Sequence, residues 1–211
     1  MDENKNDVIK ISQLGADMWV YSHFQKGYKG VFVDVGCADG QYISNTWFLE
    51  KMGWSGVAID ANPRNFECRT NTKVVKSVVS DVKNKDVEFL IPTMHDDFAG
   101  ITDKLGKFKE TLLKLESDRI MMKTSLLVDI LKENETSKRI DYISLDIEGS
   151  EFDVLSTFPF DQYEIGLITV EHNFEEPKRT HIKKLLEGKG FVLDKSEQWD
   201  DWYKNPSYFM G

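Results

Sequence analysis

The chain has 211 residues, of which 40% are hydrophobic, and a formal net charge of −9; this size and composition predict one domain around one core. The acidic balance disfavours a broad nucleic-acid-binding face, which would require clustered Lys and Arg side chains. The polar, acidic beginning of the sequence is unlike a signal peptide, and the two cysteines make no disulfide framework, so we expect a cytoplasmic protein. No apolar run approaches the ~20 residues of a membrane helix, so we expect no membrane span.

The first half of the chain alternates predicted strands and helices after an N-terminal segment, residues 1–29. Alternating apolar or β-branched runs predict strands at about 30–36, 56–60, 72–80 and 86–92. Helices are expected between them at 39–53 and from Asn62, where Pro63 would take the first helical position. Residues 92–119 show no clear period and exceed the length of an ordinary connection, so we interpret them as a lid over the acceptor.

The second half continues the same alternation. Helices are predicted at 125–134, from Ser150 and from Pro177, and strands at 139–146, 164–171, 191–194 and 207–210. Strands that alternate with helices pair in parallel through crossovers, which predicts an α/β fold with a Rossmann-like, doubly wound, mostly parallel sheet. The last two strands leave little room for a helix between them, which indicates an antiparallel edge strand. We expect residues 1–211 to form this single domain.

Acidic or polar residues follow four of the predicted strands. The segments are DVGCADG (34–40), IDAN (59–62), LDIEGSE (145–151) and VEHN (170–173). The carboxyl ends of parallel strands meet at one edge of a sheet, where α/β proteins bind their ligands. We therefore expect these side chains to converge on one crevice, although any one of them alone is typical of a helix cap or a solvated loop.

The loop after the first strand indicates what this crevice binds. It lacks the GxGxxG pattern that a dinucleotide pyrophosphate requires, and Asp39 places negative charge where that pyrophosphate would lie. S-adenosylmethionine fits better, because it carries a sulfonium and an ammonium group and no phosphate. We expect Asp34 to face the cationic methionine part, Gly36 and Gly40 to let the backbone approach, and Asp60 to accept hydrogen bonds from the ribose hydroxyls.

The predicted cofactor-binding set extends to the neighbouring strand ends. Ser80 and Asp81, which end the third strand, are expected to meet the adenine. The full set is Asp34, Gly36, Cys37, Ala38, Gly40, Asn45, Asp60, Ala61, Ser80, Asp81 and Asp146. The structural alternative is that Asp34 and Asp60 serve only as caps at the ends of their strands.

Five segments, in order, resemble the FkbM-type S-adenosylmethionine-dependent methyltransferases. They are SQLGADMW (12–19), GVFVDVGCADGQYISNT (30–46), GWSGVAIDANP (53–63), YISLDIEGSE (142–151) and VEHN (170–173). The resemblance implies a class I methyltransferase fold, S-adenosylmethionine as cofactor and O-methylation, often of a sugar or polyketide hydroxyl. Cys37 stands where alanine is common in that family, and residues 92–119 have no match in the resemblance.

Methyl transfer to an alcohol calls for a base, because a neutral hydroxyl is a poor nucleophile. We predict that His172, Glu148 and Asp146 are catalytic, with His172 favoured because imidazole can be neutral at working pH. Four further residues are predicted to contact the acceptor: Gln13, Asp17, Glu151 and Glu171. The structural alternatives are a hydrogen-bonded His at a strand end and a Glu that only stabilises the first turn of its helix.

A second arrangement would use Asp146, Glu171 and His172 to ligate Mg²⁺ or Mn²⁺ and so lower the pKa of the acceptor hydroxyl. We prefer base catalysis without a metal, so no metal ligand is predicted.

The predicted partner is a sugar or glycan and not nucleic acid, and the chain can be one module of a larger glycan-assembly polypeptide. The rival hypotheses are a non-catalytic binding or assembly domain and an NAD-type oxidoreductase.

Overall fold

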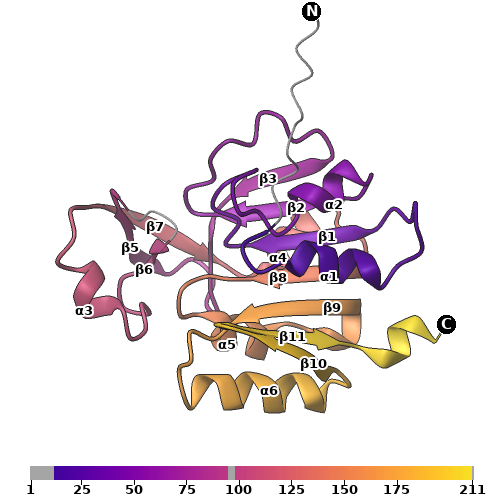
Figure 1. Ribbon diagram of the computed structural model, residues 1–211. Coiled ribbons are helices and arrows are strands. Elements are labelled where there is room, and N and C mark those ends of the chain that lie inside the picture. Colours follow the sequence, from indigo (N-terminus) through magenta and orange to yellow (C-terminus); the bar gives the residue numbers. More distant parts are fainter. Residues whose placement is uncertain (1–11, 95–97, 211) are drawn as a thin grey trace, which may run out of the picture.

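Seven strands form the main sheet of the computed structural model, which describes residues 12–94 and 98–210. Their order is β10-β11-β9-β8-β1-β2-β3 (Figure 1). The strands are β1 (Val31–Val35), β2 (Ser55–Asp60), β3 (Thr72–Lys76), β8 (Arg139–Leu145), β9 (Glu164–Glu171), β10 (Val192–Glu197) and β11 (Asp200–Lys204). Every neighbouring pair from β3 to β9 is parallel, so the predicted mixed α/β fold with a mostly parallel sheet is confirmed.

The antiparallel strand is β11, and it lies inside the sheet rather than at the edge. It pairs antiparallel with β9 on one side and with β10 on the other, so β10 is the edge strand. A tight turn with Gln198 at φ 50° reverses the chain between them, which lets the second strand of the hairpin insert beside β9. The strand predicted at 207–210 is wrong, because the 3₁₀ helix η3 (Pro206–Phe209) occupies those residues and Asn205 caps it.

Helices cover both faces of the main sheet (Figure 1). The elements are α1 (Ala16–Ser22) and α2 (Trp47–Lys51) on one face, with α4 (Leu127–Glu133), α5 (Glu151–Thr157), the 3₁₀ helix η2 (Phe160–Gln162) and α6 (Lys178–Gly188) packed on the other. Successive residues of a strand point to opposite faces. Phe32 therefore joins the cluster of Val20 and Leu49, whereas Val33 joins the cluster of Ile130 and Leu186. Among the helices of the described residues, none combines the length and the apolar character needed to cross a lipid bilayer.

A second, four-stranded sheet extends from the side toward which β1 and β9 run (Figure 1). Its order is β4-β7-β5-β6, and its elements are β4 (Val78–Val79), β5 (Asp86–Pro92), β6 (Gly100–Ile101), α3 (Lys109–Leu112) and β7 (Ser117–Ser125). Residues 92–119, which show no period in the sequence, therefore contain β6, α3 and the first residues of β7. Their interpretation as a lid stays a prediction.

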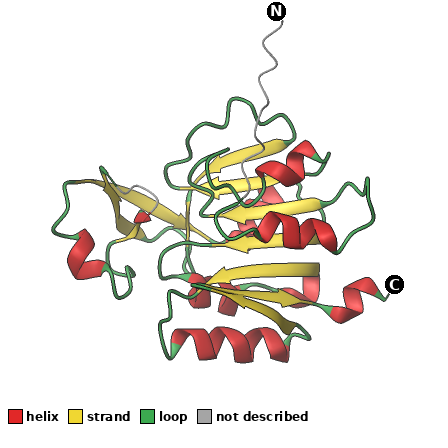
Figure 2. Cartoon of the chain, viewed as in Figure 1, coloured by secondary structure: helices red, strands yellow, loops and turns green. Residues whose placement is uncertain are grey.

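Long irregular loops follow β1 and β2, where two helices were predicted (Figure 2). The helix expected at 39–53 is reduced to α2, and residues 61–71 form turns instead of the helix expected from Asn62. The Asp39 carboxylate accepts hydrogen bonds from the N–H groups of Gln41 and Tyr42, both at 2.8 Å. The Asp60 carboxylate accepts one from the N–H of Asn62 at 2.6 Å. These bonds are of the kind that begin a helix, but Ile43 and Asn65 then take left-handed backbone angles, φ 49° and 55°, which a right-handed helix does not contain.

Candidate active site

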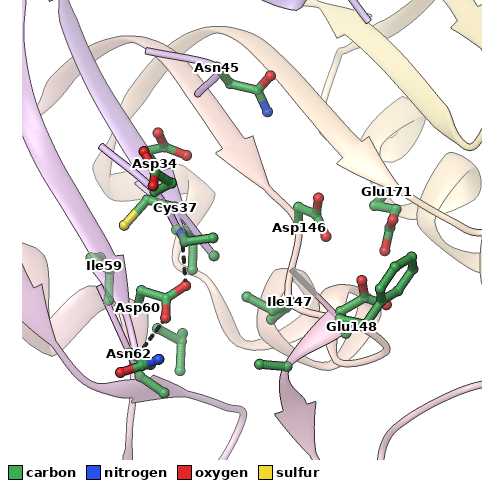
Figure 3. Close-up of a pocket in the computed structure, with 18 of the residues that line it drawn as sticks. Asp34, Cys37, Asn45, Ile59, Asp60, Asn62, Asp146, Ile147, Glu148 and Glu171 are labelled. Atoms are coloured by element: carbon green, nitrogen blue, oxygen red, sulfur yellow. Dashed lines mark hydrogen bonds between the residues drawn. The ribbon is translucent and has the colours of Figure 1, made fainter. Parts of the chain in front are cut away.

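A cavity of about 310 Å³ lies where the strands of the main sheet end (Figure 3). Four strands bring a carboxylate to its wall. Asp34 lies in β1, Asp60 ends β2, Asp146 directly follows β8, and Glu171 ends β9. The strand ends therefore converge on one crevice, which is the geometry that parallel pairing predicts.

Gly36 brings the first loop close to the end of β8. Its φ is +81°, and a Cβ atom built there would lie 1.5 Å from the carbonyl oxygen of Asp146. Its N–H donates to the carbonyl of Ile59 at 2.8 Å. Only glycine tolerates both the backbone angle and this approach. Gly36 is thus required for packing between the loop and the end of β8, whatever binds in the cavity.

Two carboxylates, the buried Asp34 and the half-buried Asp60, define the half of the cavity that lies between β1 and β2. Asp34 accepts a hydrogen bond from the hydroxyl of Thr46 at 2.7 Å. Asp60 accepts from the N–H groups of Ala38 at 3.0 Å and Asn62 at 2.6 Å, so it does cap the neighbouring loops. Burial raises the pKa of both carboxyl groups above the ordinary value of 3.8. Both acids therefore gain from a cationic or hydroxyl-bearing ligand that compensates their lost hydration.

This half of the cavity fits the cofactor that the sequence predicts. Asp34 and Asp60 offer carboxylate oxygens to a cation and to paired hydroxyls, while Val79 and Phe89 add apolar wall. Among the described residues that line the cavity, Arg64 is the one basic side chain, and its charge acts on Asp39 and Asp60. The two carboxylates and the apolar wall therefore favour a cationic, phosphate-free nucleoside over a dinucleotide.

Most of the predicted cofactor residues line the cavity. They are Asp34, Gly36, Cys37, Ala38, Asn45, Asp60, Ala61 and Asp146. Gly40, Ser80 and Asp81 lie outside the lining. Gly40 donates its N–H to the carbonyl of Arg64 at 2.8 Å, and the Ser80 hydroxyl donates to Asp81 at 2.9 Å. The cavity wall that was predicted at Ser80 and Asp81 is formed instead by Ser77, Val78 and Val79, which directly precede them.

Three carboxylates gather in the other half of the cavity, at the ends of β8 and β9. Asp146, Glu148 and Glu171 each place one carboxylate oxygen within 4.8 Å of the others (Figure 3). The side-chain amide of Asn173 donates to Glu171 at 2.7 Å and to Glu148 at 3.4 Å. Asn173 was not predicted as a site residue, although it directly follows His172 in the VEHN segment.

Burial and mutual repulsion raise the pKa of Asp146 and of Glu171 well above their ordinary values of 3.8 and 4.5. Glu148 adds to this repulsion on both groups, and a hydrogen bond between Asp146 and Glu171 partly offsets it. Like charges this close ionise together only at high cost, so the cluster holds a proton or attracts a cation. A carboxyl group with a raised pKa is a suitable general base near neutral pH.

His172 lies behind this cluster and outside the lining. Its Nδ1 accepts a hydrogen bond from the N–H of Phe174 at 2.9 Å, so the proton is assigned to Nε2, which lies 3.5 Å from the Asp201 carboxylate. Asn173 and Phe174 both have left-handed backbone angles, φ 48° and 58°. His172 therefore supports an uncommon turn that carries Asn173 into the cavity wall.

The four residues predicted to contact the acceptor divide in the same way. Gln13 and Glu171 line the cavity, and Asp17 and Glu151 do not. Asp17 is buried and accepts hydrogen bonds from the Ser12 hydroxyl and the Met18 N–H, both at 2.8 Å. Glu151 accepts from the N–H groups of Ile147 at 3.1 Å and Gly149 at 2.9 Å, which holds the loop that bears Asp146 and Glu148.

The chain was compared with known proteins in three ways, and two of the comparisons found a match. The sequence profile described as "Methyltransferase FkbM domain" matches residues 34–193. The crystal structure of a provisionally assigned ribosomal RNA methyltransferase from Plasmodium falciparum is similar at a TM-score of 0.43 with 14% sequence identity, and the match covers 85% of this chain and 88% of that chain. No curated protein matches the chain at a significant level.

Proposed function

This chain belongs to the FkbM methyltransferase family and is therefore a methyl-transferring enzyme, and we propose that it is a cytoplasmic O-methyltransferase that uses S-adenosylmethionine to methylate a hydroxyl of a sugar or glycan. The observation that carries this proposal is the acidic cavity, with two carboxylates in the half between β1 and β2 and three in the other half. The strand order, with β11 inserted antiparallel, supports a class I methyltransferase fold.

We assign the half between β1 and β2 to the cofactor. Asp34 would hold its ammonium group, Asp60 its ribose hydroxyls, and Gly36 would leave room for its approach. When bound, S-adenosylmethionine supplies an electrophilic methyl group, and its sulfur leaves with the electron pair of the broken bond as a neutral thioether. The chain's own task is to orient the acceptor oxygen and to take its proton.

We assign the proton-taking role to Asp146, supported by Glu148 and Glu171. Asp146 lies in the wall shared by both halves of the cavity, and its raised pKa brings its basicity toward working pH. His172 was the favoured base on sequence grounds. Its Nδ1 is already engaged by the Phe174 N–H and its ring does not line the cavity, so we now assign it to positioning the turn that holds Asn173.

The charge of the cavity supports a neutral acceptor. Carboxylate and amide oxygens accept hydrogen bonds from hydroxyls, whereas a phosphate or carboxylate would be repelled by Asp146, Glu148 and Glu171. Arg64, the basic side chain of the described lining, is placed near Asp39 and Asp60 in the cofactor half. These features favour a neutral sugar over a uronic acid or an RNA backbone.

A transfer assay with labelled S-adenosylmethionine tests the proposal directly. The acceptors are neutral glycosides, the matching uronic acids, a hydroxylated polyketide and a structured RNA, with products read by mass spectrometry. We expect methyl transfer to neutral glycosides and none to RNA or uronic acids. Transfer to the polyketide or the RNA alone would replace the sugar as substrate. Binding of S-adenosylhomocysteine without transfer to any acceptor would favour the non-catalytic alternative.

The metal alternative has a separate test. The metal arrangement that we considered used His172, and the structure brings Glu148 beside Asp146 and Glu171 in its place. We expect turnover to be unchanged after EDTA treatment, because the proposed base is a carboxylate of the chain. If EDTA abolished turnover and Mg²⁺ or Mn²⁺ restored it, the three carboxylates would be metal ligands and the metal-free mechanism would be wrong.

A further inference from the structure

Arg69 is a buried cation behind the loop that lines the cofactor half of the cavity. It is 7% exposed and lies in the segment between β2 and β3. Its Nε donates to Glu50 at 2.6 Å, and its terminal nitrogens reach both threonines Thr46 and Thr72 and the carbonyl of Gly40. A planar guanidinium with this many donors can fix several partners at once.

The loop that Arg69 holds has a costly backbone conformation. Between β1 and α2, Gly36, Ala38 and Ile43 have positive φ values of 81°, 39° and 49°. For a β-branched residue such as Ile43 this region is unfavourable, and it persists only when the surroundings impose it. The bonds from Arg69 to the Gly40 carbonyl and to Thr46 supply part of that constraint.

One of these bonds continues to the cofactor acid. Arg69 donates to the Thr46 hydroxyl at 3.1 Å, and that hydroxyl donates its own proton to Asp34 at 2.7 Å. Thr46 is fully buried and Asp34 is 3% exposed, so no bulk water competes for these bonds. This chain of bonds, together with a hydrogen bond from the Ser144 side chain, holds the Asp34 carboxylate.

We propose that Arg69 is a positioning residue for cofactor binding, acting through Thr46 on the orientation of Asp34. This inference rests on the proposed function, because it takes Asp34 as the residue that meets the cationic end of S-adenosylmethionine. It assigns a role in the site to a residue of the segment between β2 and β3 that lies outside the cavity lining.

The chain contains a matched control for this relay. Thr72, like Thr46, accepts a hydrogen bond from the same terminal nitrogen of Arg69, at 2.9 Å. The Thr72 hydroxyl then donates to Glu50, a structural partner, whereas that of Thr46 donates to Asp34. The two threonines therefore make equivalent bonds to Arg69, and only one of them reaches the cavity.

The experiment measures the affinity of the full chain for S-adenosylhomocysteine by calorimetry, together with the midpoint of thermal unfolding. We expect Thr46→Val to weaken binding by about tenfold, because a buried carboxylate loses a charge-assisted hydrogen bond. Thr72→Val should lower the midpoint of thermal unfolding as much as Thr46→Val does, but it should change affinity by less than about twofold. Thr46→Ser, which keeps the hydroxyl, should restore affinity. Arg69→Lys should weaken binding as Thr46→Val does, because an ammonium group cannot keep all the bonds at once.

The outcomes separate this inference from the proposed function. If the unaltered chain binds no S-adenosylhomocysteine, the proposed function fails. If it binds, but Thr46→Val and Thr72→Val weaken binding equally, or Thr46→Ser fails to restore it, Arg69 only stabilises the fold and the inference is wrong.

Discussion

At the scale of single residues, Glu151 was predicted to contact the acceptor, but it binds the backbone of the loop that bears Asp146 and Glu148. Its side chain is fully buried and pairs with Lys178 at 3.0 Å. The variant Glu151→Gln keeps an oxygen for the Ile147 and Gly149 N–H groups but leaves Lys178 with a weaker partner. We expect it to lower the free energy of unfolding by about 2 kcal/mol, because the buried Lys178 ammonium then keeps only its longer ion pair, with Glu175 at 3.4 Å. Urea unfolding followed by fluorescence measures this change.

The matched control at the same scale is the exposed pair of Arg139 and Glu164. These side chains are 52% and 70% exposed, and their charged atoms lie 3.0 Å apart. Glu164→Gln should cost less than about 1 kcal/mol, because solvent screens an exposed pair. Equal costs for Glu151→Gln and Glu164→Gln would show that burial does not strengthen the ion pair of Glu151 and Lys178.

At the scale of elements, Gly149 is one of the contacts between the acid-bearing loop and the segment that we interpret as a lid. Its φ is +123°, and an added Cβ would lie 2.1 Å from the carbonyl oxygen of Lys104. We expect Gly149→Ala to destabilise the chain by about 2 kcal/mol and to push residues 104–106 away. Trypsin should then cut at Lys104 and Lys107 faster than in the unaltered chain, while affinity for S-adenosylhomocysteine is unchanged.

The control is Gly188, the last residue of α6, whose added Cβ would meet no atom within 4 Å. Gly188→Ala should be neutral or stabilise the chain by about 0.5–1 kcal/mol. If Gly149→Ala left the rate of trypsin cleavage unchanged, the segment would not be held through this contact. Weaker S-adenosylhomocysteine binding in the variant would instead show that the two halves of the cavity are not independent.

The same elements show where sequence reasoning succeeds and where it fails. The acids of β1 and β2 were predicted because strand period and strand ends are local properties of the sequence. The helix predicted from Asn62 was wrong and the one predicted at 39–53 was too long, because Ile43 and Asn65 take left-handed backbone angles that interrupt a helix. Arg69 and Thr46 carry no local signal, because their contact joins segments that only the folded sheet brings together.

At the scale of the whole molecule, the fold was predicted more completely than the site. Alternating strands and helices predicted parallel pairing from β3 to β9, because crossover connections leave few other arrangements. The insertion of β11 beside β9 and the second sheet depend on long-range pairing, which periodicity does not encode. The acidic cluster followed from the fold, because parallel strands place their ends together, but the roles within it required the hydrogen bonds of His172, Glu151 and Asn173.

The carboxyl groups with raised pKa values predict how the stability of the whole chain depends on pH. The folded-state pKa is raised well above 3.8 for Asp146 and above 4.5 for Glu171, and to about 6 for Asp200, mainly by burial. Between about pH 4.5 and 7 the folded state therefore binds more protons than the unfolded state, so stability falls as pH rises. Asp201 and Glu50 have lowered pKa values and act in the opposite sense, so stability also falls below about pH 4. We expect the thermal midpoint to be highest near pH 5.

The double variant Asp146→Asn and Glu171→Gln tests whether the cavity causes this dependence. We expect it to raise the midpoint at pH 7.5 and to flatten the fall between pH 5 and 7.5, with about 2–4 °C for each kcal/mol regained. A control of equal charge removes two exposed carboxylates instead, Asp103→Asn and Glu164→Gln, whose side chains are 94% and 70% exposed. It should leave the slope unchanged. If both double variants flatten the curve equally, the net charge of −9 and not the buried acids governs stability. If only the cavity variant does so, the chain sacrifices stability at neutral pH to keep closely spaced carboxylates in its cavity, as expected of a functional site.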